Sequence, residues 1–159
     1  MVDKIEIVLT WAEVMIGGTV GIMRQVKNLK DGREDRYGAP KDKGWTLHID
    51  GACGEQALAK HLKMYWSGNL GNFRAADVGS LQVRTTQYHN GHLLLHDDDK
   101  DDDIFVLMTG LVPALRIRGW CFAKEGKMDD FKKDPLGGRE AYFVPQEILR
   151  PMATLKEHL

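Results

Sequence analysis

The sequence predicts an α/β (α+β) protein with a central mixed β-sheet of about five or six strands, flanked by two main N-terminal helices. Two observations predict this fold class. In the first 66 residues, apolar side chains recur at helical spacing over two long stretches, whereas most later apolar segments are short and strand-like. The chain has 159 residues, of which 43% are hydrophobic, which is enough for one domain with a buried core. We therefore expect a single domain over residues 1–159.

The N-terminal segment is predicted to form a short strand followed by a long helix. Residues 4–9 alternate charged and apolar side chains, as a half-buried strand does. Thr10 and Glu13 fit a capping box, which starts a helix that should run to about Leu29. The apolar positions of this helix are Trp11, Val14, Met15, Gly18, Ile22, Val26 and Leu29.

Three glycines interrupt this first helix, at positions Gly17, Gly18 and Gly21. Each weakens the helix by roughly 1 kcal/mol relative to alanine, so we expect another backbone to approach closely there. A Gly-x-x-x-Gly dimer face is the alternative, although that signal belongs mainly to membranes. The spacing of these glycines is therefore also consistent with a homo-oligomer.

A second helix is predicted from about Trp45 to Trp66, after a charged, glycine-rich loop at residues 30–44. Its narrow apolar stripe consists of Leu47, Gly51, Glu55, Leu58, Leu62 and Trp66. Glu55 lies in the middle of that stripe. A buried carboxylate must be paired, protonated or bound to a metal, because an isolated buried charge is unfavourable. Glu55 is therefore either a metal ligand or a structural residue that caps an amide or meets an internal arginine.

The remaining strands are predicted at residues 80–86, 91–95, 104–108, 115–122 and 141–144. In the first of them, alternation places Gln82 and Arg84 on a polar face opposite Leu81 and Val83. Residues 104–108 are continuously apolar, which predicts a central strand covered on both faces. Residues 115–122 alternate so that Arg116, Arg118 and Trp120 share one side, which predicts a basic outer face.

Composition limits the partners and the compartment. The formal net charge of -1 means that nucleic-acid binding requires a local basic patch. The arginines that could contact phosphates are Arg33, Arg36, Arg116 and Arg118, with a solvated surface as the alternative. The two cysteines, Cys53 and Cys121, form no metal or disulfide motif, which favours a reducing cytoplasm. The chain shows neither a signal peptide nor a membrane-spanning run, so we expect no membrane partner.

The order of Glu55 on a helix, Asp77 at a glycine bend and Gln82-Val83-Arg84 on a strand resembles the PD-(D/E)XK nuclease-like superfamily, also called restriction-endonuclease-like. The resemblance covers about residues 45–123. The segment DVGSLQVRTT also resembles small uncharacterised phage proteins of that type. This resemblance implies a restriction-endonuclease-like core, DNA as the substrate, Mg²⁺ (or Mn²⁺) as the cofactor and, for a phage protein, the host-cell cytoplasm.

The resemblance also implies a role for each motif residue. Glu55 and Asp77 would bind the metal through carboxylates, Gln82 through its side-chain oxygen and Val83 through its carbonyl. Mg²⁺ prefers such hard oxygen ligands, and it polarises a phosphodiester and lowers the pKa of an attacking water. Arg84 stands where lysine is usual. Arginine stays charged, so it can stabilise the transition state as a fixed cation but cannot accept a proton.

Two functions are consistent with these residues. The first is a metal-dependent nuclease that hydrolyses DNA phosphodiester bonds, with Glu55, Asp77, Gln82 and Arg84 as its catalytic residues. The second is a catalytically degenerate nuclease-fold binding module, such as a phage accessory protein, in which a glutamate, an aspartate and an arginine form a buried ion-pair network. Glu55 on the apolar stripe favours the first function, and the departures at Gln82 and Arg84 favour the second.

Overall fold

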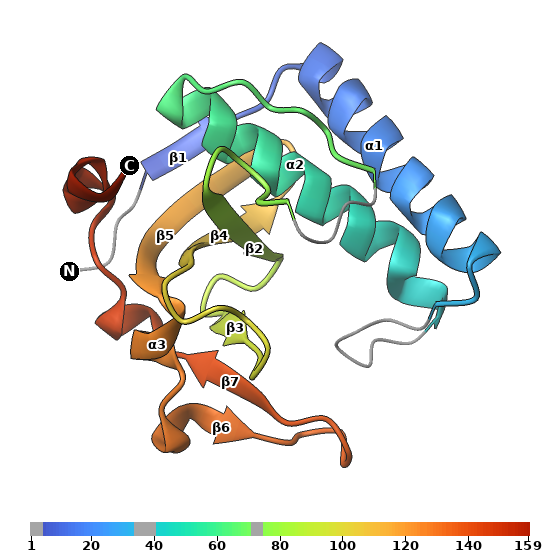
Figure 1. Ribbon diagram of the computed structural model, residues 1–159. Coiled ribbons are helices and arrows are strands. Elements are labelled where there is room, and N and C mark those ends of the chain that lie inside the picture. The colour runs from blue at the N-terminus through green and yellow to red at the C-terminus, as the bar shows by residue number, and fades with distance from the viewer. Residues whose placement is uncertain (1–4, 34–40, 71–74) are drawn as a thin grey trace.

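The computed structural model describes residues 5–33, 41–70 and 75–159 (Figure 1). Two long helices, α1 (Trp11–Lys30) and α2 (Gly44–Leu62), run antiparallel, and α2 lies between α1 and a four-stranded sheet. The strands of that sheet, in spatial order, are β1 (Ile5–Val8), β5 (Ala114–Phe122), β4 (Ile104–Leu111) and β2 (Leu81–Thr86). It is a mixed sheet, because β2 pairs parallel to β4 whereas the other neighbours are antiparallel.

A second sheet lies on the side of the first that faces away from α2. Its strands, in spatial order, are β3 (Leu93–Leu95), β7 (Ala141–Val144) and β6 (Lys132–Lys133). The short helices are α3 (Ala123–Gly126), η1 (Lys41–Lys43), η2 (Asp129–Phe131), η3 (Gln146–Ile148) and η4 (Met152–His158). The mixed α/β (α+β) class is thus confirmed, but among the described residues the central mixed sheet has four strands rather than about five or six, and the remaining strands form the second sheet. Among the described residues, no helix is long and apolar enough to cross a membrane.

Strand β4 is buried on both faces, which confirms the prediction for its continuous apolar run. Ile104, Val106 and Met108 pack into the core between the sheet and α2. Phe105 and Leu107 point the other way, into the core that β3 and β7 cover. A strand with no solvent-facing side needs apolar residues at every position, which explains why its sequence does not alternate.

Strand β5 contains a bulge that reverses its alternation. Leu107 pairs with Gly119 and Met108 with Ile117, so Arg118 is the extra residue. Beyond the bulge Trp120 enters the same core as Ile117, and Arg118 is only 4% exposed. The predicted basic outer face is therefore wrong for Arg118, which is buried, and for Trp120, because the inserted residue shifts every later side chain to the opposite face.

Helix α1 begins with the predicted capping box: the Thr10 hydroxyl accepts from the Glu13 amide and the Glu13 carboxylate accepts from the Thr10 amide. The helix packs on α2 through a face of small and polar residues. Gly17, Gly21 and Gln25 are buried there. A Cβ atom at Gly21 would lie 2.4 Å from Ile49 Cα, and one at Gly17 would lie 2.8 Å from Cys53 Sγ. The predicted close backbone approach is confirmed at Gly21.

At Gly18, by contrast, an added Cβ would meet nothing within 4 Å, so the expected close approach is wrong at this position. Most of the apolar stripe to which Gly18 belongs points away from α2. Its residues Trp11, Met15, Ile22, Val26 and Leu29 are exposed.

Gly21→Ala is expected to lower the free energy of unfolding by about 1–2 kcal/mol, because the methyl group would meet main-chain atoms of Ile49, which cannot rotate away. Gly18→Ala on the same helix is the control, and it should raise that free energy by up to about 1 kcal/mol through helix propensity alone. Urea unfolding at one low protein concentration measures both. Equal effects at the two glycines would contradict a tight helix contact at Gly21.

Helix α2 is enclosed along its middle. Every residue from Ala52 to Ala59 is buried, because α1 covers one side and the sheet covers the other. Small residues allow this double contact: a Cβ at Gly54 would lie 1.9 Å from Thr85 Oγ1 on β2. The helix ends at Leu62, earlier than predicted, and Lys63 adopts a left-handed conformation with φ 55°. The following segment turns back towards α1.

Candidate functional site

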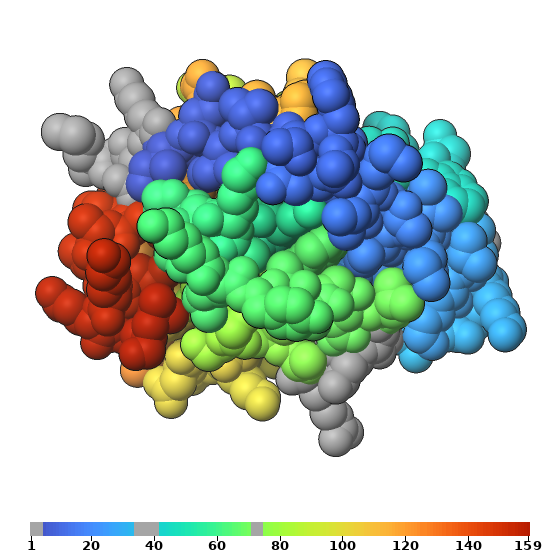
Figure 2. All heavy atoms as spheres, turned by 90° about the horizontal axis from the view of Figure 1, so that it is seen from above, coloured from blue at the N-terminus to red at the C-terminus, as the bar shows by residue number. Residues whose placement is uncertain are grey.

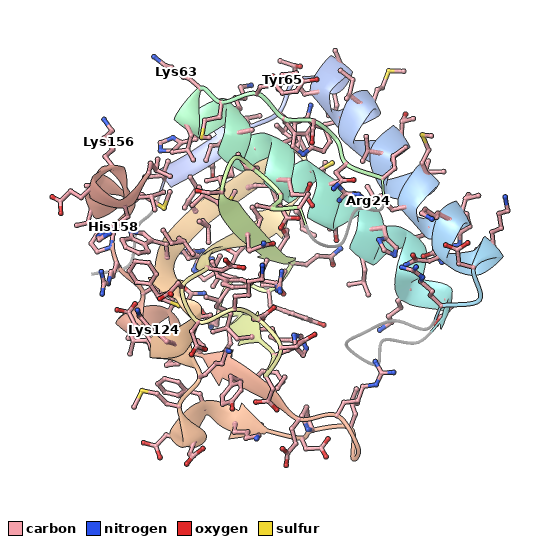
Figure 3. All side chains as sticks on the ribbon, viewed as in Figure 1. Arg24, Lys63, Tyr65, Lys124, Lys156 and His158 are labelled. Atoms are coloured by element: carbon pink, nitrogen blue, oxygen red, sulfur yellow. The ribbon has the colours of Figure 1, made fainter. Side chains whose placement is uncertain are left out.

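Glu55 is held by an arginine from the neighbouring helix. Arg24, labelled between α1 and α2 in Figure 3, donates from Nη1 to Glu55 Oε1 at 2.8 Å and from Nη2 to Oε2 at 2.9 Å. The exposed fractions of the two side chains are 15% for Arg24 and 8% for Glu55. Such a bidentate, largely buried pair is a strong, geometrically specific contact. Glu55 therefore meets an internal arginine, which is the structural alternative raised from the sequence.

The segment after α2 completes the surroundings of this ion pair. Because the chain turns back at Lys63, the Trp66 indole Nε1 donates to Glu55 Oε2 at 3.0 Å. The Asn69 carbonyl accepts from Arg24 Nε at 2.8 Å. Both Glu55 oxygens and three Arg24 nitrogens are thus hydrogen-bonded within the chain. The two charges thus compensate each other within the chain, with no need for an external ligand.

Asp77 is the second acidic residue that the structure brings to this place. It precedes β2 in a tight turn, and its Oδ2 accepts from the Val83 amide at 2.8 Å. The pKa of Asp77 is raised to about 6, mainly by burial and also by the negative charge of Glu55, although the Val83 amide and the charges of Arg84 and Arg24 act to lower it. The two predicted acidic residues are therefore close enough for their charges to interact.

Strand β2 is an edge strand, and Asp77 lies against its open edge. The N–H and C=O groups of one strand residue point to the same side, so the Val83 carbonyl also faces this edge. Asp77 and the Val83 carbonyl, two of the predicted metal ligands, thus share one location. A carboxylate with a raised pKa beside a backbone carbonyl can exchange a proton near neutral pH or accept a cation.

Gln82 and Arg84 extend to the other face of the sheet. In the parallel register Gln82 pairs with Phe105 and Arg84 with Leu107, and both partners belong to the core away from α2. The Arg84 guanidinium lies over the Phe105 ring, 4.7 Å from its centroid. Its Nη2 lies 3.3 Å from Asp99 Oδ1, in an ion pair. The predicted four-residue site is therefore split, with Glu55 on one face and the Gln82 and Arg84 side chains on the other.

The division of the predicted metal ligands between two faces of the sheet determines how well they fit one Mg²⁺ ion. The Asp77 carboxylate and the Val83 carbonyl suit a hard cation, but Glu55 already has both oxygens bound and its charge neutralised by Arg24. The Gln82 side chain leaves the strand on the far face. The donor set as arranged does not fit the predicted metal shell.

The four predicted phosphate-binding arginines do not form one patch in the described structure. Arg33 is exposed and lies 3.9 Å from Asp31, and Arg116 pairs with Glu6 at 3.0 Å on the sheet surface. Arg118 is buried, where its Nε donates to Thr109 Oγ1 at 2.7 Å. Arg36 lies outside the described residues.

Sequence reasoning missed Arg24, the residue that decides the state of Glu55. A signal for it exists, because Arg24 follows Gly17 and Gly21 at helical spacing and so lies on the face that packs against α2. Reading that glycine face as the inner one would have identified Arg24 as a buried charge.

Comparison of the chain with protein-family models, with curated proteins and with solved structures found no match.

Proposed function

We propose that this chain is a catalytically degenerate nuclease-fold binding module that binds DNA without hydrolysing it. The observation that carries the proposal is the bidentate Arg24–Glu55 ion pair, which puts a guanidinium where a nuclease of this type would hold its metal ion. Arg84 forms an ion pair with Asp99. Because its guanidinium group is always charged, it cannot serve as a proton acceptor. DNA as the ligand rests on the resemblance of the Glu55, Asp77 and Gln82-Val83-Arg84 order to a superfamily that acts on DNA.

The proposed location is the cytoplasm, which would be that of the host cell for a phage protein. Both cysteines support a reducing compartment. Cys53 and Cys121 are buried, unbridged thiols, and burial raises the pKa of Cys53 to about 11 and that of Cys121 to about 12. Thiols with such pKa values are inert structural residues.

A metal-dependent nuclease is the second candidate, and the environment of Asp77 favours it. Burial is the main cause of its raised pKa, and a bound divalent cation would stabilise the charged form of this carboxylate. In that function Glu55 would exchange Arg24 for Mg²⁺ or Mn²⁺, and the Val83 carbonyl would be an auxiliary ligand, whereas the Gln82 side chain lies on the other face of the sheet. The metal would supply Lewis-acid activation of water and phosphate.

One experiment separates the two functions. Purified protein is incubated with single-stranded and duplex DNA with Mg²⁺, Mn²⁺ or a chelator, and binding is followed by fluorescence anisotropy while cleavage is followed on gels. The binding module predicts a dissociation constant that rises steeply with salt and cleavage no faster than in the chelator control. It also predicts no rise in melting temperature with millimolar Mn²⁺.

The variants are Asp77→Ala and, as a matched control, Asp102→Ala, whose side chain is 88% exposed. Cleavage that requires metal and is lost in Asp77→Ala but kept in Asp102→Ala would overturn the binding module and establish the nuclease. Absence of both binding and cleavage would exclude DNA as the ligand.

A further inference from the structure

Helix α1 presents a large apolar surface to solvent. Its exposed apolar side chains, hereafter the outer α1 face, are Trp11, Met15, Ile16, Ile22, Met23, Val26 and Leu29. Their exposed fractions run from 45% at Ile22 to 74% at Trp11. The atoms of α1 lie at the surface in the view from above (Figure 2). Monomeric soluble proteins seldom expose contiguous apolar patches of more than a few hundred Å², so a surface of this kind indicates an interaction site.

The fold itself does not require these apolar residues. Helix α1 contacts α2 through the opposite face, where Gly17, Gly21 and Gln25 are buried. Polar residues along the outer face would therefore leave the α1–α2 contact intact. A helix that is apolar on its solvent side and glycine-rich on its core side reverses the usual pattern, in which the apolar stripe faces the core.

The outer α1 face can be covered without burying an unsatisfied polar group. The only charged residues between Trp11 and Val26 are Glu13 and Arg24, and both bond to α2, through Lys60 and Glu55. Thr19 lies at the centre of the face, and its hydroxyl donates to the Met15 carbonyl at 2.7 Å. Removing water from this surface therefore carries little of the desolvation penalty that unpaired polar groups would add.

The size of the face matches what a stable protein–protein contact needs. Seven large apolar side chains that are about half exposed offer roughly 700–800 Å², which is close to the ~800 Å² that each partner buries in an interface of standard size. Val8 on the edge strand β1, 55% exposed, adds apolar area close to the start of α1.

The face is complementary to itself when reversed. An antiparallel pair centred between Gly18 and Thr19 puts the large Trp11 opposite the smaller Val26, and Met15 opposite Ile22. Antiparallel helices place each terminus beside the opposite partial charge of the other dipole.

We propose that the outer α1 face binds the same face of a second copy of this chain, forming a two-fold dimer through an antiparallel α1–α1 pair. A two-fold contact requires one surface that is complementary to itself, and the size pairing and the antiparallel helix dipoles described above meet this requirement. The dimer does not depend on the DNA-binding proposal, because no residue of the outer α1 face is part of that proposal.

Sedimentation equilibrium of the full chain tests the dimer. The wild type is expected to be dimeric at micromolar concentration, and Ile22→Glu should weaken dimerisation at least 100-fold by placing a carboxylate in the covered face. Leu136→Glu is the matched control: Leu136 is 66% exposed in the turn before β7, and its replacement should leave the dimer unchanged. Circular dichroism checks that each variant is folded.

A second variant keeps the test decisive if Ile22→Glu does not fold. Thr19→Cys places a thiol beside the two-fold axis, and oxidised glutathione should convert the protein to a covalent dimer, whereas Leu136→Cys should not cross-link. A wild type that is monomeric up to ~100 μM, or an Ile22→Glu protein that stays dimeric, would overturn the proposal. So would a monomer that co-sediments with anionic phospholipid vesicles, since a lipid surface would then be the occupant.

Discussion

Arg24→Met is expected to lower the free energy of unfolding by about 3–5 kcal/mol, because removing one partner of a buried ion pair leaves an uncompensated charge. Glu55 would keep the Trp66 hydrogen bond but lose both contacts to the guanidinium. Methionine retains much of the length and apolar bulk of the arginine side chain, so the expected loss comes from the charge rather than from a cavity.

Two further variants identify the source of this loss. Arg24→Met combined with Glu55→Leu should regain most of the stability, because replacing a whole buried pair by apolar residues is often neutral. Arg116→Met is the matched control, since its ion pair with Glu6 is on the surface and should contribute less than about 1 kcal/mol. Guanidinium unfolding curves measure all four proteins. A loss in Arg24→Met no larger than in Arg116→Met would contradict a structural role for the pair.

Asp77→Asn is expected to stabilise the protein above pH 6 and to have little effect near pH 4. Folding raises the pKa of Asp77 from its ordinary value of 3.8 to about 6, so the folded chain binds this proton more tightly than the unfolded chain. Between these two pH values the folded state holds more protons, and stability therefore falls as the pH rises. A shift of this size corresponds to about 3 kcal/mol at most above pH 6.

Asparagine removes the ionisation but retains an oxygen that can accept from the Val83 amide. Thermal unfolding at pH 4, 6 and 8 should show a difference between Asp77→Asn and the wild type that grows with pH. Asp102→Asn, a change at an exposed carboxylate, should show no such trend. An Asp77→Asn variant less stable than the wild type at pH 8 would contradict this prediction, because it would mean that the fold stabilises the Asp77 carboxylate as an anion.

Local signals in the sequence predicted much of the fold. The capping box at Thr10, the continuous apolar run at residues 104–108 and the polar face of Gln82 and Arg84 each depend on neighbouring residues, and the structure has them as expected. The predictions that were wrong depend on contacts between residues that are far apart in the sequence. The bulge at Arg118 is an insertion in the pairing of two strands, and alternation within β5 alone does not reveal it.

For the candidate site, the sequence predicted which residues are unusual but not how they are connected. Glu55 and Asp77 lie close enough for their charges to interact. The partner of Glu55 comes from α1, and its identification requires knowing which face of that helix is inner. The apolar stripe of α1 does not identify that face, because outward-pointing apolar residues give the same period as inward-pointing ones.

The enclosure of α2 restricts the substitutions that this part of the chain can accept. Each position from Ala52 to Ala59 is buried between α1 and the sheet, so a substitution that fits one neighbour is constrained by the other. Relatives of this chain should therefore keep the segment nearly unchanged for reasons of packing alone. Invariance of Glu55 within such a block would not mark it as a catalytic residue, whereas variation at Asp77, on the open edge of β2, would be informative.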